Sequence, residues 1–159
     1  MRPHALALAL GAIVLGLPAA AQDSGRAVAE QFATIMDADG DGTMSAQEVR
    51  AFADTAFGSV DTDENGALSV AEMIDWQYGF AELAAFRDRT QAFETTVAVI
   101  HDMFDRDNDG LVTTEEHDDA ILRSVEYSDL DGDGTLTREE YLGGFIYNIA
   151  MRNALDAAR

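Results

Sequence analysis

The sequence has no cysteine, no lysine, and only two prolines among its 159 residues. Without cysteine the chain can form no disulfide framework, no cysteine-linked lipid anchor and no thiolate nucleophile. A G-x-S-x-G motif, the signature of one large class of serine nucleophiles, is also absent. These absences argue against an enzyme, and they require that a feature other than disulfides stabilise the fold.

Positive charge is scarce as well. All ten basic residues are arginines, against 30 acidic residues, and the formal net charge is −20. Such a charge repels the phosphates of nucleic acids and anionic membrane surfaces, so neither is expected as a partner. Strong acidity can indicate disorder, but a hydrophobic content of 47% argues against it. A folded protein that binds cations accounts for both numbers.

The N-terminus has the organisation of a secretory signal peptide. A short basic start is followed by an apolar run over residues 5–17 and by the small residues of Pro18–Ala21. The apolar run has 13 residues, whereas a membrane-spanning helix needs roughly 20. We therefore expect cleavage after residue 21 and export to the periplasm or the cell exterior, with no membrane attachment afterwards. The mature chain, residues 22–159, loses Arg2 and has a net charge of −21.

A twelve-residue pattern, D-x-[DN]-x-[DN]-G-x5-E, occurs four times. The four segments are DADGDGTMSAQE (residues 37–48), DTDENGALSVAE (61–72), DRDNDGLVTTEE (105–116) and DLDGDGTLTREE (129–140). One match in an acidic protein could be accidental, but four complete matches indicate a repeated unit. The segments, called loops 1 to 4 below, resemble the calcium loop of the EF-hand family.

The resemblance implies which residues bind the ion, because calcium takes six to eight oxygen ligands from fixed loop positions. Positions 1, 3 and 5 supply side-chain oxygens: Asp37, Asp39 and Asp41; Asp61, Asp63 and Asn65; Asp105, Asp107 and Asp109; Asp129, Asp131 and Asp133. Position 7 supplies a backbone carbonyl from Thr43, Ala67, Leu111 and Thr135, and position 12 supplies two oxygens from Glu48, Glu72, Glu116 and Glu140. The expected cofactor is Ca²⁺, up to four ions per chain.

Two further positions recur in every loop. Position 8 is apolar (Met44, Leu68, Val112, Leu136), and in the EF-hand family this residue lies in a short strand that pairs with a neighbouring loop. Position 9 is serine or threonine, three residues before the ligand glutamate. That spacing predicts a capping box, so the same residues begin a helix and close a metal site.

The spacing of the loops predicts how they pair. Only 12 residues separate loop 1 from loop 2, and 12 separate loop 3 from loop 4. In the first connector Val49, Phe52, Ala53, Ala56, Phe57 and Val60 form a helical stripe. A single helix in each connector holds its two loops about 20 Å apart. We therefore expect loop 2 to pair with loop 3 and loop 1 with loop 4; the alternative is pairing of consecutive loops, with a kink near Gly58.

The remaining segments are also predicted to be helical. Residues 73–104 are long enough for a hairpin, with an outgoing helix through Met73 and Leu83, a turn near residues 87–90, and a returning helix through Phe93 and Phe104. A last amphipathic helix runs from Tyr141 to Leu155 and is expected to bend at its two consecutive glycines. The predicted fold is all-α: helix-loop-helix repeats with four calcium loops in one compact domain over residues 22–159.

Among EF-hand proteins, the loops are similar to those of calmodulin. The predicted signal peptide and short connectors are closer to small exported bacterial EF-hand proteins, and the spacing partly resembles lanmodulin, a lanthanide-selective periplasmic protein. The lanmodulin family has proline at loop position 2 and an acidic residue at position 9. This chain has Ala38, Thr62, Arg106 and Leu130 at position 2, and serine or threonine at position 9. Dockerin loops end in aspartate, unlike the four glutamates here.

Three functional hypotheses follow: a calcium buffer or calcium-stabilised module, a calcium sensor with a protein partner, and a scavenger of lanthanides. A sensor groove could be lined by Met36, Met44, Met73, Met103 and Met151, although methionines at helical spacing are more often core residues. Trp76, Tyr78 and Phe80 are likewise expected to pack in the core. His101 and His117 are expected to be helix residues beside the loops and not transition-metal ligands or catalytic bases.

Overall fold

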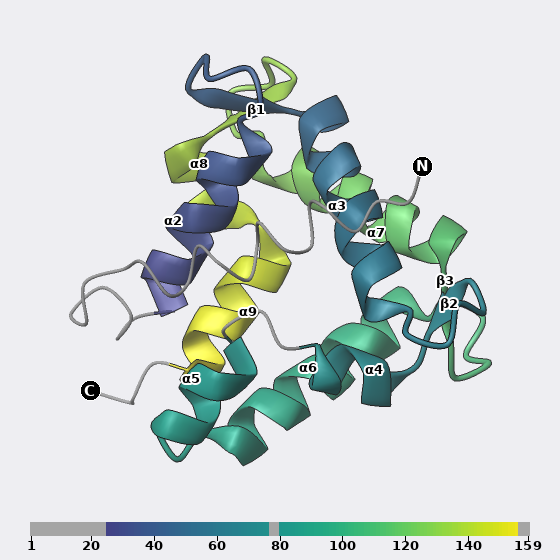
Figure 1. Ribbon diagram of the computed structural model, residues 1–159. Coiled ribbons are helices and arrows are strands. Elements are labelled where there is room, and N and C mark those ends of the chain that lie inside the picture. The colour runs from purple at the N-terminus through teal and green to yellow at the C-terminus, as the bar shows by residue number, and fades with distance from the viewer. Residues whose placement is uncertain (1–24, 77–79, 156–159) are drawn as a thin grey trace.

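The computed structural model describes residues 25–76 and 80–155 (Figure 1). The predicted signal peptide and Tyr78 lie outside these residues. In the described ranges the helices are α2 (Gly25–Met36), α3 (Ala46–Val60), α4 (Val70–Asp75), α5 (Phe80–Phe86), α6 (Thr90–Phe104), α7 (Thr114–Ser128), α8 (Arg138–Gly144) and α9 (Ile146–Leu155). None of them is both long enough and apolar enough to cross a membrane. The prediction of an all-α fold is confirmed.

Helices α3 and α7 each join two loops without interruption. Each begins with a capping box, and the first aspartate of the following loop caps its C-terminal end, Asp61 for α3 and Asp129 for α7. In α3 the apolar stripe faces inward, and the helix continues without a break through Gly58. The two helices pack along each other, and the Arg50 guanidinium of α3 bonds the Asp118 carboxylate of α7 at 2.5 Å. The predicted single-helix connectors are confirmed.

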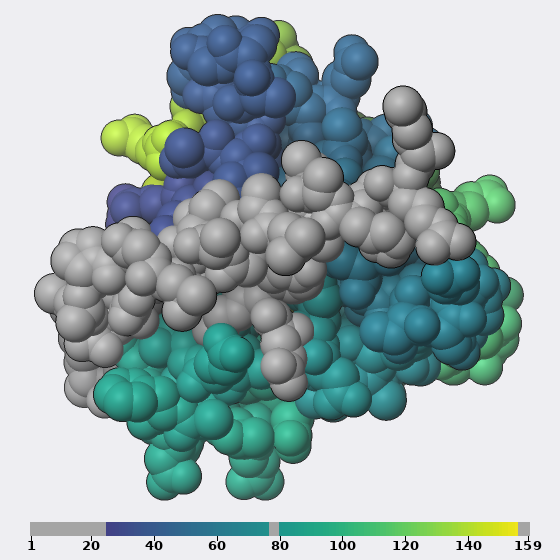
Figure 2. Space-filling view, viewed as in Figure 1, coloured from purple at the N-terminus to yellow at the C-terminus, as the bar shows by residue number. Residues whose placement is uncertain are grey.

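Four short strands join the loops in the predicted pairs. Strand β1 (Thr43–Ser45) pairs antiparallel with β4 (Thr135–Thr137), and β2 (Ala67–Leu68) pairs with β3 (Val112–Thr113). Loop 1 therefore lies beside loop 4, and loop 2 lies beside loop 3, so consecutive loops do not pair. In Figure 1 the two pairs occupy separate corners, one at the top and one at the right. Figure 2 shows loops 1 and 2 at those corners of the surface.

The outgoing arm of the predicted hairpin is not one helix. Helix α4 stops at Asp75, and Trp76 caps it with an extended backbone, ψ 103°. The Trp76 indole N–H donates to the Ser59 hydroxyl at 3.0 Å, which holds the side chain against α3. Helix α5 then begins at Phe80, whose ring contacts Phe32 edge-on at 5.7 Å. The predicted turn near residues 87–90 is present, and α6 returns from it as a continuous helix.

The core is a continuous apolar cluster that includes residues from both loop pairs. The position-8 residues of all four loops belong to it. Met44 faces Leu136 across one sheet and Leu68 faces Val112 across the other, and each is at most 2% exposed. Met36, Met73 and Met151 are also buried, as expected, but Met103 is 58% exposed and is not a core residue. The loops are thus attached directly to the core.

The predicted bend in the last helix is present at Phe145, between α8 and α9. The two glycines before it have different surroundings. A Cβ at Gly144 would lie 2.9 Å from the Ser128 Cα, whereas a Cβ at Gly143 would meet nothing within 4 Å. The close approach of α8 to the end of α7 therefore requires glycine at position 144 only.

This contrast predicts opposite effects for two substitutions in one helix. Gly144→Ala should lower the free energy of unfolding by about 1–3 kcal/mol, because the backbone of α7 must move. Gly143→Ala, its matched control, should be neutral or raise stability by up to about 1 kcal/mol, because alanine favours the helix. Urea denaturation in saturating calcium measures both, and equal effects would contradict the proposed close contact.

Candidate metal sites

The structure gathers acidic side chains into four clusters, one in each loop. In each cluster a carboxylate oxygen from positions 1, 3 and 12 lies within 4.8 Å of the others. The clusters are Asp37, Asp39 and Glu48; Asp61, Asp63 and Glu72; Asp105, Asp107 and Glu116; and Asp129, Asp131 and Glu140. Twelve of the predicted ligands are therefore brought together in four groups of three.

The same backbone hydrogen bonds shape all four loops. The amide of the position-6 glycine donates to the position-1 aspartate, at 3.1 Å for Gly42 and 2.9 Å for Gly66, Gly110 and Gly134. All four glycines have positive φ, between 83° and 93°. This left-handed backbone is accessible to glycine without steric cost. The turn points the amide toward the carboxylate and folds the loop around a central space.

The predicted ligands at positions 5 and 7 lie next to these clusters but outside the groups of three. The backbone amide of position 5 donates to the position-3 carboxylate, at 3.1–3.2 Å in the four loops. The position-5 side-chain oxygen in turn accepts from the backbone amide of position 7, at 2.8–2.9 Å: Asp41 from Thr43, Asn65 from Ala67, Asp109 from Leu111 and Asp133 from Thr135. Thr43, Ala67 and Thr135 begin strands, and Leu111 directly precedes one.

The position-12 glutamates begin the exit helices, and all four predicted capping boxes are present. Hydrogen bonds from the Ser69 and Thr113 backbone amides are the main reason that the pKa of Glu72 and of Glu116 falls to about 2. The pKa values of Glu48 and Glu140 are lowered by the corresponding bonds from Ser45 and Thr137. These carboxylates are therefore ionised at neutral pH and lose their charge only as the pH falls through the depressed pKa.

The donor atoms fit calcium. All side-chain ligands are oxygens, mostly carboxylate, which hard divalent cations prefer. In loop 1 the Asp37 Oδ1 atom is buried and has no hydrogen-bond partner. A buried carboxylate oxygen without a partner is costly, and a bound cation would remove that cost. The residues present therefore suit a calcium ion.

Sequence reasoning missed the role of position 4. This residue has a left-handed backbone in every loop, with φ of 76° at Gly40, 57° at Glu64, 58° at Asn108 and 72° at Gly132. Glycine and asparagine adopt this conformation most readily. Their occurrence in three of the four loops was the available signal, and Glu64 is the exception.

Loop 2 is expected to bind calcium most weakly. Asn65 stands where the other loops have a charged aspartate. Its side-chain amide donates to Asp63 Oδ2 at 2.9 Å, so one oxygen of that ligand is already engaged in a hydrogen bond. Glu64 adds backbone strain. In an NMR titration that follows the four position-6 glycine amides, Gly66 should respond last. Asn65→Asp should raise the affinity of loop 2 by about fivefold. If loop 2 filled first, this ranking would be wrong.

The two histidines are helix residues beside the loops, as predicted. His101 is buried in α6, and its Nε2 lies 3.1 Å from the Leu68 carbonyl oxygen of β2. His117 directly follows Glu116 in α7 and contacts the rings of Phe57 and Phe104 edge-on, at 5.3 and 6.1 Å. Burial lowers the pKa of His117 to about 4, so its ring is neutral at pH 7.

Comparison with protein families adds independent support. A family model described as EF hand matches residues 34–53 and 128–143, the segments that contain loops 1 and 4. No curated protein matches the sequence. The family match and the acidic clusters together indicate metal binding, with calcium as the ion that the site chemistry favours. The partial likeness of the loop spacing to lanmodulin stays a prediction.

Proposed function

Because the chain is an EF-hand protein, we propose that it binds one Ca²⁺ in each of its four loops and acts outside the cytoplasm. In this proposal it is a calcium buffer or a calcium-stabilised module, and not an enzyme. The observation that carries the proposal is the repetition of one loop design. Four loops share the same carboxylate cluster, the same glycine turn and the same capped exit helix.

Charge supports the same function. Eighteen of the 30 acidic residues lie in the four loops. Four bound Ca²⁺ would change the charge of the mature chain from −21 to −13, which reduces the repulsion that opposes a compact fold. Extracellular EF-hand sites have dissociation constants of roughly 10⁻⁴ to 10⁻³ M, which suits an exported protein. The signal-peptide pattern of residues 1–21 supports export.

The methionines bear on the sensor alternative, because a sensor keeps a methionine-rich surface closed without calcium and exposes it when calcium binds. Here Met36, Met44, Met73 and Met151 are at most 9% exposed and packed in the core. A lanthanide scavenger would use the same oxygen ligands. The relative affinity for La³⁺ and Ca²⁺, and not the geometry of the loops, therefore distinguishes a scavenger from a calcium buffer.

Two measurements on the mature protein test the proposed role. Calorimetric titrations with Ca²⁺, Mg²⁺ and La³⁺ should give calcium affinities in the extracellular range and no preference for La³⁺ of many orders of magnitude. Retention on a hydrophobic resin should be no greater with calcium than without it. Retention that calcium increases would favour the sensor, and a very large La³⁺ preference would favour the scavenger.

A further inference from the structure

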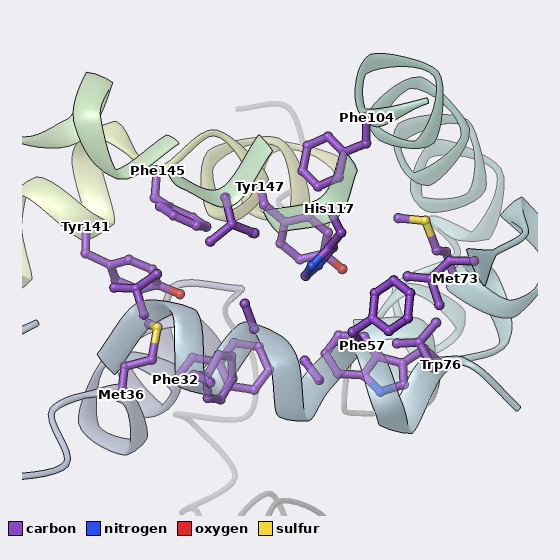
Figure 3. Close-up of a pocket in the computed structure, with 17 residues that line it drawn as sticks. Phe32, Met36, Phe57, Met73, Trp76, Phe104, His117, Tyr141, Phe145 and Tyr147 are labelled. Atoms are coloured by element: carbon purple, nitrogen blue, oxygen red, sulfur yellow. The ribbon is translucent and has the colours of Figure 1, made fainter. Parts of the chain in front are cut away.

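An apolar cavity of about 90 Å³ lies in the middle of the molecule, between the two loop pairs (Figure 3). Among the residues that the structure describes, seventeen line it: Trp76 and Phe145, which follow α4 and α8, and residues of α2, α3, α4, α6, α7, α8, α9 and β2. Eight are phenylalanine, tyrosine or tryptophan, and none is an aspartate, glutamate, lysine or arginine. The cavity is therefore unlike the four acidic clusters, and calcium binding does not explain it.

The cavity contacts all four loops through the residues that flank their ligands. Seven wall residues are direct sequence neighbours of a position-1 or position-12 ligand: Met36, Val49, Val60, Met73, Phe104, His117 and Tyr141. Each of these wall residues is therefore one peptide bond away from a predicted calcium ligand, and this adjacency is the basis for the coupling proposed below.

We propose that this cavity is a binding site for a small, uncharged aromatic molecule of about one ring, and that its occupancy is coupled to calcium in the loops. The coupling rests on the proposed function, whereas binding in the cavity does not. By thermodynamic linkage, calcium should raise the affinity for the aromatic molecule, and the molecule should raise the affinity for calcium by the same factor.

The size and lining of the cavity select the ligand class. An apolar cavity of about 150 Å³ engineered into another protein stays dry and binds benzene. The cavity here, at about 90 Å³, is smaller and therefore admits no more than one ring and no peptide helix. Aromatic walls favour aromatic guests through edge-to-face contacts. A charged guest would be desolvated without a counter-charge in the wall, which is costly. The strong negative charge of the chain disfavours anions in addition.

Polar groups inside the cavity indicate that the ligand also forms a hydrogen bond. The Nδ1 atom of His117 is buried and has no hydrogen-bond partner. In Figure 3 this imidazole and the hydroxyl groups of Tyr141 and Tyr147 extend into the space between the aromatic rings. A few polar groups in an apolar cavity are typical of a small-molecule site. A phenol-like ligand fits this combination.

Phenol, toluene and benzoate are suitable probes, with the calcium-loaded mature protein. Trp76 is the only tryptophan of the chain and lies in the cavity wall, so its fluorescence reports occupancy. Phenol should bind about fivefold more tightly than toluene because it satisfies a buried polar group, and benzoate should not bind. Absence of binding by both neutral probes would overturn the proposal. A second result would also overturn it: tight binding of a designed amphipathic helical peptide by a protein that binds neither phenol nor toluene. That result would indicate a protein partner.

Variants of helix α3 provide a matched test. Ala56→Phe fills the cavity and should weaken phenol binding by about tenfold or more, whereas Ala51→Phe, exposed on the same helix, should leave it within about twofold. Unchanged phenol affinity in an Ala56→Phe protein that still takes up calcium would overturn the proposal.

If Ala56→Phe does not fold, His117→Leu is the second variant. It should remove the preference for phenol over toluene, and a preference that persists would overturn the proposal. Phenol binding without any calcium uptake would contradict the proposed function and the coupling, but not the cavity site.

Discussion

Addition of a calcium chelator to the mature protein is expected to abolish most of its helical circular dichroism, and excess calcium is expected to restore it. Metal sites rarely exist in the unfolded chain, so the energy of binding contributes directly to folding. At calcium tenfold above the dissociation constant each site contributes about 1.4 kcal/mol, and four sites contribute about 6 kcal/mol. That equals the whole stability of many small domains.

Three features make this protein more dependent on its ions than its core alone would predict. No disulfide can replace the metal, because the chain has no cysteine. Each of α3 and α7 begins after one loop and ends at the next, so both helix ends lose their anchor together. Without ions the carboxylates of each cluster repel one another at close range. A chelator already saturated with calcium is the control, and an unchanged spectrum in excess free chelator would contradict the expectation.

Leu136→Ala is expected to destabilise the calcium-saturated protein by about 2–5 kcal/mol, the range for a leucine fully buried in a core. Leu136 is 0% exposed and lies opposite Met44 in the sheet that joins loops 1 and 4. Its loss leaves a cavity at the point where the loop pair is attached to the helices. Urea denaturation in saturating calcium measures the change in the free energy of unfolding.

Leu130→Ala is the matched control in the same loop. Leu130 is 81% exposed at position 2 of loop 4, and its truncation should change stability by no more than about 0.5 kcal/mol. A loss for Leu136→Ala as small as that for Leu130→Ala would contradict the role of the sheet in connecting the loops to the core. Calcium titration of both variants then separates a loss of packing from a loss of metal binding.

Much of the structure could be predicted because calcium coordination fixes residue types at fixed spacing. The loop pattern located the clusters of positions 1, 3 and 12, and the serine or threonine before Glu48 and its equivalents predicted the capping boxes. The 12-residue connectors were too short for two helices, so a single helix in each favoured the pairing of loop 2 with loop 3 and of loop 1 with loop 4. Steric limits of this kind do not depend on distant contacts.

Other features depend on tertiary contacts that periodicity does not report. The apolar spacing of Met73, Trp76 and Phe80 is compatible with one helix, but the structure has two. The hydrogen bond from Trp76 to Ser59 lies at the end of the first helix, and the contact of Phe80 with Phe32 lies at the start of the second. Met103 matches the apolar stripe of α6 yet is 58% exposed. The central cavity arises where seven helices meet, and no local segment encodes it. The backbone angle at Glu64 is likewise set by the loop and not by its residue type.

The native mass of the mature protein, measured in a volatile buffer with calcium, tests the central claim most directly. We expect a mass that corresponds to four bound calcium ions, and to three for Glu116→Gln at the same calcium concentration. A protein that binds no ion at millimolar calcium, or only two, would contradict the account.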